Sequence, residues 1–149
     1  MSQPIIPYLN FDGQCEAAFL FYQSILGGEI PYIGRFGDMP ESEQMKVSAS
    51  EANKVLHMSL LTSEGLHLMG SDCPSDYIDT LKKGTNISLS INAKDRPDAE
   101  RIFNGLSAGG EITMALADTF WGAYFGMWID KFGISWMVNY DDPAKMQQH

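Results

Sequence analysis

The chain repeats part of its own sequence, and this repeat constrains the fold more than any other feature. Residues 9–30 read LNFDGQCEAAFLFYQSILGGEI, and residues 91–112 read INAKDRPDAERIFNGLSAGGEI, so that the GGEI at 27–30 recurs at 109–112. A fixed internal period is typical of a structure built from repeated units. The alternative is chance recurrence of GGEI after two amphipathic helices. The matching helical phase of the two segments favours duplication.

The second part of each half also aligns, but at a different offset. Gly65 falls on Gly133 and Met69 falls on Met137 when the offset is 68 residues instead of 82. The first half therefore carries 14 extra residues, which we place in the loop around Gly37–Asn53.

Each half has the pattern of a strand, a helix and three further strands. Strands are indicated by short apolar alternation between turn residues, and helices by apolar residues at helical spacing. The predicted helices are Gln14–Leu26 and Pro97–Ala108. The predicted strands are Ile5–Phe11, Glu29–Phe36, Val55–Thr62, Leu66–Ser71, Asn86–Asn92, Glu111–Met114, Trp121–Asp130 and Ile134–Tyr140.

This order predicts an α+β fold made of two tandem βαβββ modules. Module one covers about 4–72, a linker about 73–84 and module two about 85–140, all within a single domain of 149 residues. We expect the polar tail at 141–149 to fray.

Composition excludes several functions. The chain has 10 Lys and Arg against 19 Asp and Glu, a net charge of −9, and it shows no basic cluster for nucleic acid or anionic lipid. No apolar run approaches the roughly 20 residues that span a bilayer. Two cysteines, Cys15 and Cys73, are too few for a disulfide framework. With no signal-peptide pattern at the N-terminus, we expect a soluble, cytoplasmic protein.

The strands separate by parity into an apolar face and a mixed one. In Asn86–Asn92, Ile87, Leu89 and Ile91 point one way and the polar residues point the other. We expect the apolar face to pack on the helices and the mixed face to line a concave ligand cavity, although an ordinary solvent-exposed sheet is the alternative. The predicted lining residues are Tyr8, Asn10, His67, Met69, Asn86, Ser88, Ser90, Trp121 and Met137.

Several short motifs together resemble a known family. They are Pro7–Phe11 with Gly13, Cys15–Ala17, Phe21-Tyr22, Gly27-Gly28, Asp118–Gly122, Phe125-Gly126, Asp130–Gly133 and Trp136–Asn139. In these the chain resembles the PhnB-like branch of the glyoxalase/bleomycin resistance protein/dihydroxybiphenyl dioxygenase (vicinal oxygen chelate) superfamily. The resemblance implies two βαβββ modules in a cupped, open mixed sheet, and a homodimer.

Members of this branch are often labelled 3-demethylubiquinone 3-methyltransferase-like. The common methyltransferase fold needs a glycine-rich strand-to-helix turn, which this sequence lacks.

The resemblance also implies four metal-binding strand positions, normally His or Glu. In this chain they fall on Pro4, Met69, Asn86 and Met137, which do not suit the divalent ions of the superfamily, so we predict neither metal nor other cofactor. His57 and His67 are expected on one hairpin, close enough to lie near each other, but two histidines are a weak metal signal.

Two functions from different classes remain open. The first is binding of a small amphipathic or aromatic molecule without the family metal. The second is a small-molecule enzyme (lyase, isomerase or transferase type) that uses His57 or Tyr8 in proton transfer. The sequence leaves open whether His57 faces the cavity, and whether Trp121 packs in the core instead of stacking on a ligand. We interpret Asp72 as a turn former.

Overall fold

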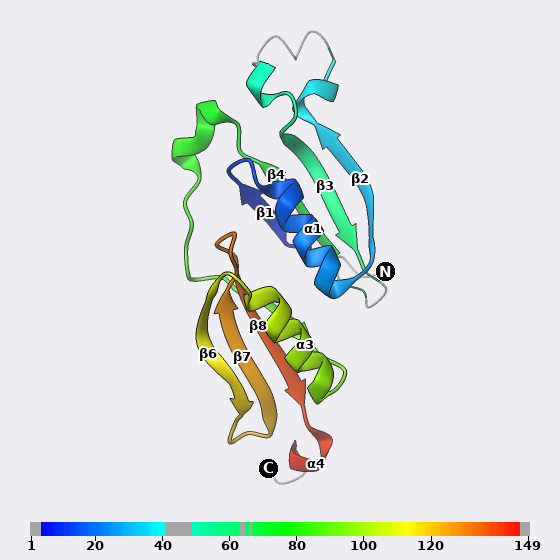
Figure 1. Cartoon of the computed structure of the whole chain (residues 1–149), viewed down its shortest axis with the longest axis vertical. Helices are drawn as coiled ribbons and strands as arrows, with labels where there is room; N and C mark the ends of the chain where they lie inside the picture. The colour runs from blue at the N-terminus through cyan, green and yellow to red at the C-terminus, as the bar shows by residue number, and fades with distance from the viewer. Residues whose placement is uncertain (1–3, 41–48, 63–64, 66, 147–149) are drawn as a thin grey trace. The chain divides into compact units, whose positions relative to one another are not determined.

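The computed structural model describes residues 4–40, 49–62, 65 and 67–146. The chain forms two compact units, Met1–Lys82 and Lys83–His149. Each unit contains one four-stranded mixed sheet with an α-helix against one of its faces (Figure 1). The α+β fold of repeated βαβββ modules is therefore confirmed. Among the described residues no helix is both long and apolar enough to cross a membrane.

The N-terminal sheet has the strand order β1-β4-β3-β2. Strand β1 pairs with β4 in parallel, and the other two pairs are antiparallel. Its elements are β1 (Tyr8–Phe11), α1 (Cys15–Leu26), β2 (Glu29–Arg35), the 3-10 helices η1 (Phe36–Asp38) and η2 (Ala49–Glu51), β3 (Val55–Leu61), β4 (His67–Asp72) and η3 (Ser75–Thr80).

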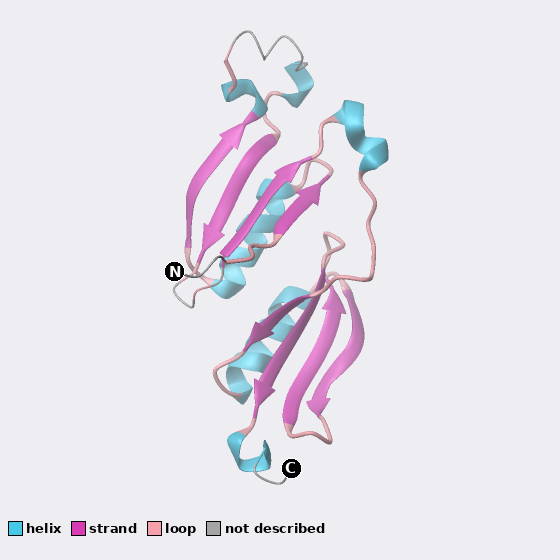
Figure 2. Cartoon of the chain, turned by 180° about the vertical axis from the view of Figure 1, so that it is seen from behind, coloured by secondary structure: helices cyan, strands magenta, loops and turns pink. Residues whose placement is uncertain are grey.

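The C-terminal sheet repeats this topology with the order β5-β8-β7-β6, and its α-helix lies against one face of the sheet (Figure 2). Its elements are β5 (Leu89–Asn92), α3 (Arg96–Ser107), β6 (Glu111–Asp118), β7 (Ala123–Ile129), β8 (Ser135–Asp141) and the short helix α4 (Pro143–Met146). The tail predicted to fray thus contains a helical turn, in which Lys145 donates to Asp118 at 2.7 Å.

Strand register confirms the internal repeat residue by residue. In the parallel pair of the N-terminal sheet Tyr8 lies opposite Met69, and in the C-terminal sheet Ser90 lies opposite Met137. These four positions are related by the two offsets found in the sequence. The extra residues of the first half lie between β2 and β3, as predicted, although 41–48 fall outside the described residues.

The repeated glycines explain why GGEI recurs at the same place. A Cβ on Gly28 would collide with the carbonyl oxygen of Leu61 at the end of β3, and a Cβ on Gly110 would collide with that of Ile129 at the end of β7. In both units the chain that leaves the helix passes directly against a strand backbone, which only glycine permits. The preceding residues, Gly27 and Gly109, both have φ of +77°.

Burial follows the predicted parity within the strands. Leu9 and Phe11 of β1 are buried while Tyr8 and Asn10 are exposed, and in β8 Trp136 and Val138 are buried. The prediction is wrong at Ile87, which is 74% exposed, because β5 begins only at Leu89 and Ile87 belongs to the preceding loop. Leu66, the first residue of the predicted strand Leu66–Ser71, lies outside the described residues.

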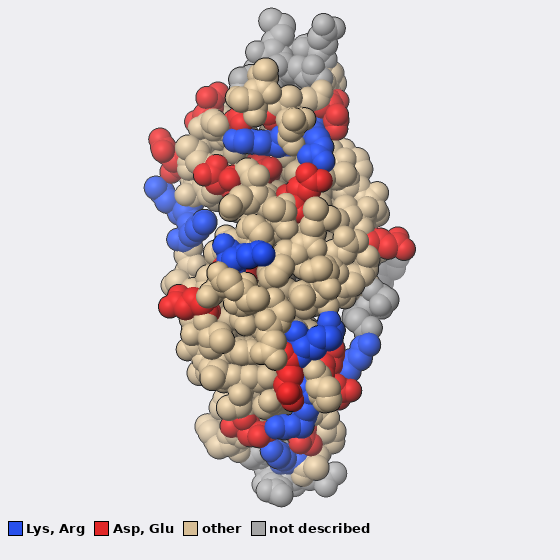
Figure 3. Space-filling model, viewed as in Figure 1, with Lys and Arg blue, Asp and Glu red and all other residues tan. Residues whose placement is uncertain are grey.

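Ion pairs fasten the helix of the C-terminal unit to its sheet. Arg96, the first residue of α3, donates to both carboxylate oxygens of Asp118 at 2.8 and 3.1 Å, and its guanidinium lies 3.9 Å from the ring centroid of Tyr124. In the space-filling view the basic side chains of this unit lie beside acidic ones (Figure 3).

Candidate functional site in the N-terminal sheet

The candidate site residues from the sequence fall into two groups, one in each unit. Strands of the N-terminal unit carry Tyr8, Asn10, His57, His67 and Met69. On this sheet the helix covers the face that holds Leu9, Phe11 and Leu68. We call the opposite side the open face.

Tyr8 and His57 form a hydrogen-bonded pair across this open face. The Tyr8 hydroxyl lies 3.0 Å from Nδ1 of His57, and the two rings are stacked with centroids 5.6 Å apart and an interplanar angle of 26°. His57 therefore shares the open face with Tyr8. The two side chains proposed for proton transfer are within reach of each other.

Tyr32 completes an aromatic cluster that sequence reasoning missed. Its ring centroid lies 6.0 Å from that of His57. Tyr32 is in β2, and Tyr8 is in β1, which lies on the other side of the His57 strand β3. The ring lies over Gly34, where a Cβ would collide with the Tyr32 hydroxyl. The signal in the sequence was the pair of Tyr32 and Gly34 on one predicted strand, two residues apart and therefore on one face.

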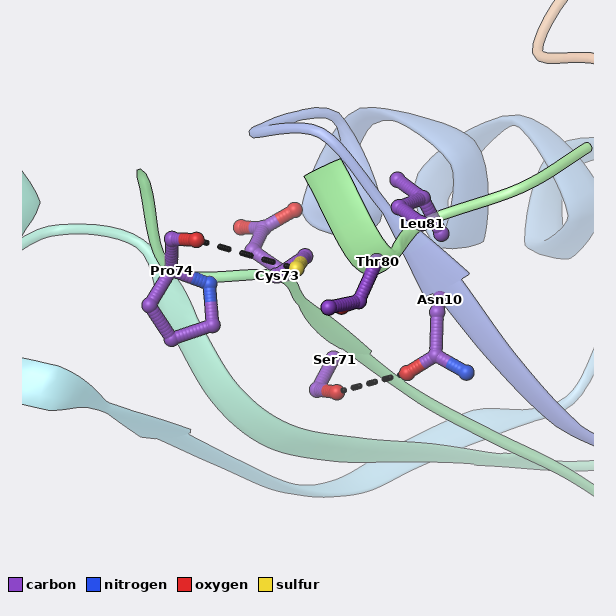
Figure 4. Close-up of a pocket in the computed structure, with 7 residues that line it drawn as sticks. Asn10, Ser71, Cys73, Pro74, Thr80 and Leu81 are labelled. Carbon is purple, nitrogen blue, oxygen red and sulfur yellow. Dashed lines mark hydrogen bonds between the residues drawn. The ribbon is translucent and has the colours of Figure 1, made fainter. Parts of the chain in front are cut away.

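A pocket of about 270 Å³ adjoins this cluster at the ends of β1 and β4. Its lining residues are Asn10, Ser71, Asp72, Cys73, Pro74, Thr80 and Leu81 (Figure 4). Ser71 Oγ lies 3.4 Å from Oδ1 of Asn10, and the residues after β4 return through η3 to supply Thr80 and Leu81. Of this lining, the sequence predicted only Asn10 as a ligand contact. Ser71 and Asp72 were expected at the end of module one but not as ligand contacts, and the other four residues come from the predicted linker, whose fold no periodicity revealed.

Strand register connects the pocket to the aromatic cluster. Asn10 of β1 pairs with Ser71 of β4. Met58 of β3 pairs with Gly70 of β4, and because these two strands are antiparallel, His57 before Met58 lies beside Ser71 after Gly70. Asn10, Ser71 and His57 therefore form a row across three neighbouring strands of the open face.

Asp72 is a structural carboxylate of the strand itself, so its interpretation as a turn former is wrong. It is 3% exposed, and its two oxygens accept hydrogen bonds from the backbone N–H groups of Cys15 and Val55, each at 2.9 Å. It thereby caps the N-terminus of α1, where Gln14 provides no side-chain cap. Burial, and then the negative charge of Asp72, raise the pKa of the Cys15 thiol, which keeps that cysteine protonated.

The two histidines do not form a common site. His67 lies opposite Leu61, so it is separated from His57 by four residues, roughly 13 Å, along β3. The expectation that they lie close together is wrong, because the hairpin register places them near opposite ends of β3. Among the described residues, no three His, Cys, Asp or Glu side chains gather as metal ligands.

In the C-terminal unit the predicted lining residues are partly on the sheet and partly outside it. Ser90 of β5 and Met137 of β8 lie opposite each other on its open face. Asn86 and Ser88 precede β5. Trp121 lies in the turn before β7 and is 44% exposed, with its ring edge-on to Phe120 and Phe125. The strand predicted from Trp121 therefore starts two residues too early.

The residues at the four positions where the superfamily binds its metal ion do not suit that ion. Pro4 has no donor side chain and precedes β1, and Asn86 precedes β5. Met69 and Met137 offer only thioether sulfur, which is a poor ligand for Mg²⁺, Mn²⁺, Zn²⁺ or Ni²⁺ sites built from imidazole and carboxylate. We therefore assign no chemistry to such an ion here.

Comparison with known proteins identifies the family. A family model described as 3-demethylubiquinone-9 3-methyltransferase matches residues 3–139. The chain belongs to this family. It is 34% identical over 138 residues to the protein YjdN of Escherichia coli K12, covering 91% of this chain and 94% of YjdN. This confirms the expected family, whose members are often labelled 3-demethylubiquinone 3-methyltransferase-like.

Solved structures agree with the family and the fold. The protein PA1353 from Pseudomonas aeruginosa is 37% identical, with a TM-score of 0.80 over 95% of this chain and 99% of that chain. A PhnB protein from Bacillus cereus is 25% identical, with a TM-score of 0.71 over 93% and 99%. A glyoxalase/bleomycin resistance protein/dioxygenase family enzyme from Burkholderia phytofirmans PsJN shares the fold alone, at 14% identity and a TM-score of 0.57 over 90% and 96%.

Proposed function

We propose that this protein binds a small amphipathic molecule with an aromatic part on the open face of its N-terminal sheet. The observation that carries the proposal is the continuity of the pocket with the aromatic cluster, through the row of Asn10, Ser71 and His57. Ligand sites combine an apolar or aromatic wall with a few placed polar groups, and this face offers both.

The pocket and the aromatic cluster would hold different parts of the ligand. A volume of about 270 Å³ is near the lower end of small-molecule pockets, so it would accommodate a polar substituent or one small ring. The hydrogen bond of Ser71 engages the amide oxygen of Asn10 and leaves the amide nitrogen available to donate. The rest of the ligand would stack on Tyr8, His57 and Tyr32.

The name of the family supports the same ligand class. 3-Demethylubiquinone has an oxygen-substituted ring, so its head group is a small amphipathic aromatic. Methyl transfer itself is not part of the proposal. Each sheet here has one parallel strand pair and two antiparallel ones, whereas the common nucleotide-dependent methyltransferase uses a doubly wound parallel sheet.

Ligand-observed NMR with 2-methoxyphenol as the probe tests binding. We expect saturation transfer to its aromatic protons from the wild-type protein and loss of that transfer in Asn10→Ala and in Tyr8→Ala. Asn92→Ala is the matched control, because Asn92 occupies the equivalent position in the C-terminal repeat. Absence of transfer from the wild-type protein, or equal loss in Asn92→Ala, would contradict the proposal.

Proton transfer is the second candidate, and the contact between Tyr8 and His57 at 3.0 Å favours it. A hydrogen-bonded phenol and imidazole can pass a proton to or from a bound carbonyl compound. The test is deuterium uptake at the carbon next to the carbonyl of hydroxyacetone in D₂O. We expect His57→Gln to abolish the catalysed uptake and His67→Gln to retain it; equal rates in both variants would refute a role for His57.

A further inference from the structure

Three methionines lie side by side on the open face of the C-terminal sheet. Met114 of β6 is opposite Met127 of β7, and Met127 is opposite Met137 of β8. We call these three residues the methionine row. On β5, next to Met137, the row ends at Ser90. It is independent of the ligand site proposed above, which lies wholly in the N-terminal unit.

The geometry of the sheet allows the three sulfur atoms to converge. Cβ atoms of directly opposite residues are about 4.5–5.5 Å apart, and each methionine has three rotatable bonds with which to lean over the central Met127. Strand β6 is irregular in register on both sides of Met114. Such irregularities re-aim the side chain at which they occur.

The residues around the methionine row favour a soft metal ion over a hard one. On the same face of β7, the residues two positions from Met127 are Phe125 and Ile129. On β8, the residues two positions from Met137 are Ser135 and Asn139. None of these is a carboxylate, an imidazole or a thiol. The nearest carboxylate by register is Glu111, which lies opposite Ile129 at the start of β6. A metal ion at the row would therefore meet thioether sulfur and little else.

We propose that the methionine row binds one soft monovalent cation of the Cu(I) and Ag(I) class through its three thioethers. Thioether ligands select such ions over Zn²⁺, Mn²⁺ and Mg²⁺. The same reasoning that excludes the superfamily metal, with its need for imidazole and carboxylate, thus predicts a different ion at a different set of residues. In this site Met137 is one of three thioether ligands of a soft ion, and it does not replace a His or Glu ligand of the superfamily metal.

The experiment is a titration with Ag(I), whose closed shell avoids redox chemistry, followed by NMR of methionines labelled with ¹³C at the methyl group. The background variant is Cys73→Ser, because the partly exposed Cys73 thiol is itself a soft ligand, while Cys15 is fully buried. Met127→Leu removes the central donor with little change of volume. Met69→Leu is the matched control, since Met69 is the repeat equivalent of Met137 but has Tyr8 and Ser59 as its row neighbours.

We expect the methyl signals of Met114, Met127 and Met137 to shift together and to saturate at one Ag(I) per chain. Met127→Leu should weaken binding by more than the roughly 10–100-fold that loss of an outer-shell partner costs a metal site, and Met69→Leu should leave it unchanged. Equal affinity in these two variants, shifts spread over all nine methionines, or no shift in the row overturns the proposal.

Discussion

The two sheets have the same register but different open faces. Four repeat-equivalent positions form one row in each sheet. In the N-terminal sheet the row is Tyr8, Met69, Ser59 and Tyr32, and in the C-terminal sheet it is Ser90, Met137, Met127 and Met114. The helix-facing sides keep apolar residues in both sheets, because burial constrains them. The open faces have diverged into an aromatic and polar surface and a methionine surface, since the helix of each unit packs on the other face and does not hold them alike.

The two helices also begin differently. Asp95 caps α3 locally by accepting from the backbone N–H of Asp98 at 2.8 Å. In the N-terminal unit the cap of α1 comes from Asp72, a long way along the chain at the end of β4, and the same carboxylate also holds the start of β3. The repeat equivalent of Asp72 is Tyr140, which has no such role to fill because α3 supplies its own cap.

The largest expected effect tests which face of each sheet is buried. Ile91 is 4% exposed and its repeat equivalent Leu9 is 9% exposed, so Ile91→Asp and Leu9→Asp each bury an unpaired charge. We expect both to cost several kcal/mol against a total stability of roughly 5–15 kcal/mol, enough to unfold their module. Ser90→Asp should remain folded, since its carboxylate can stay hydrated. Urea unfolding followed by circular dichroism measures the difference.

The neighbouring Leu89 sharpens the same test. Because Leu89 is only half-buried, Leu89→Asp should lower the free energy of unfolding by less than Ile91→Asp does. If Ser90→Asp unfolds the protein while Ile91→Asp stays folded, the assignment of the two faces is wrong, and the methionine row and its proposed ion are wrong with it.

A smaller effect compares the two caps. Asp95→Ala removes one exposed cap and should cost about 0.5–2 kcal/mol. Asp72→Ala leaves two buried backbone N–H groups without their charged acceptor, each worth about 1.5–3 kcal/mol, so we expect it to cost about 3 kcal/mol or more. Hydrogen exchange at the amides of Cys15 and Val55 should accelerate only in the Asp72 variant. Equal destabilisation by the two substitutions would show that the buried carboxylate contributes no more than a local cap.

Much of this fold could be predicted because the same pattern of helices and strands occurs in both halves of the sequence. The helices and strands were expected within a few residues of their observed bounds, since apolar periodicity and the glycines after each helix mark them. Errors occurred where tertiary pairing ends a strand. Strand β5 is shorter than its alternating pattern, because parallel pairing with β8 reaches only from Leu89 to Asn92, and β6 is longer because β7 supports it as far as Asp118.

The candidate site was less predictable than the fold. Parity placed Tyr8 and Asn10 on the open face, but the contact between Tyr8 and His57 depends on a hairpin register that no local pattern encodes. The sequence does not reveal the pocket, because four of its seven lining residues come from the segment interpreted as a linker. Asp72 was misjudged because its partners, Cys15 and Val55, are distant in sequence and bind through backbone groups that carry no residue signature.

The smallest expected effect is the acid response of two ion-paired carboxylates, one in each module. Hydrogen bonds from Arg96 and Lys145 hold the pKa of Asp118 well below its ordinary value of 3.8, and hydrogen bonds from Lys54 and Ser75 lower the pKa of Glu51 from 4.5 to about 2. Because each folded-state pKa is depressed, each carboxylate stabilises its module above the ordinary pKa. That stabilisation is lost as the pH falls through the window below it.

Asp118→Asn and Glu51→Gln should therefore melt at a lower temperature than the wild-type protein at pH 7, by a small amount because both ion pairs keep contact with solvent. The gap for Glu51→Gln should close between pH 4.5 and about 2, and the gap for Asp118→Asn should begin to close below pH 3.8 and persist to lower pH. Melting curves from pH 2 to 7 at low salt measure both gaps, and 1 M NaCl is the control, since screening should shrink them at every pH. A gap that widens on acidification would show that these ion pairs do not stabilise their modules in the way the structure indicates.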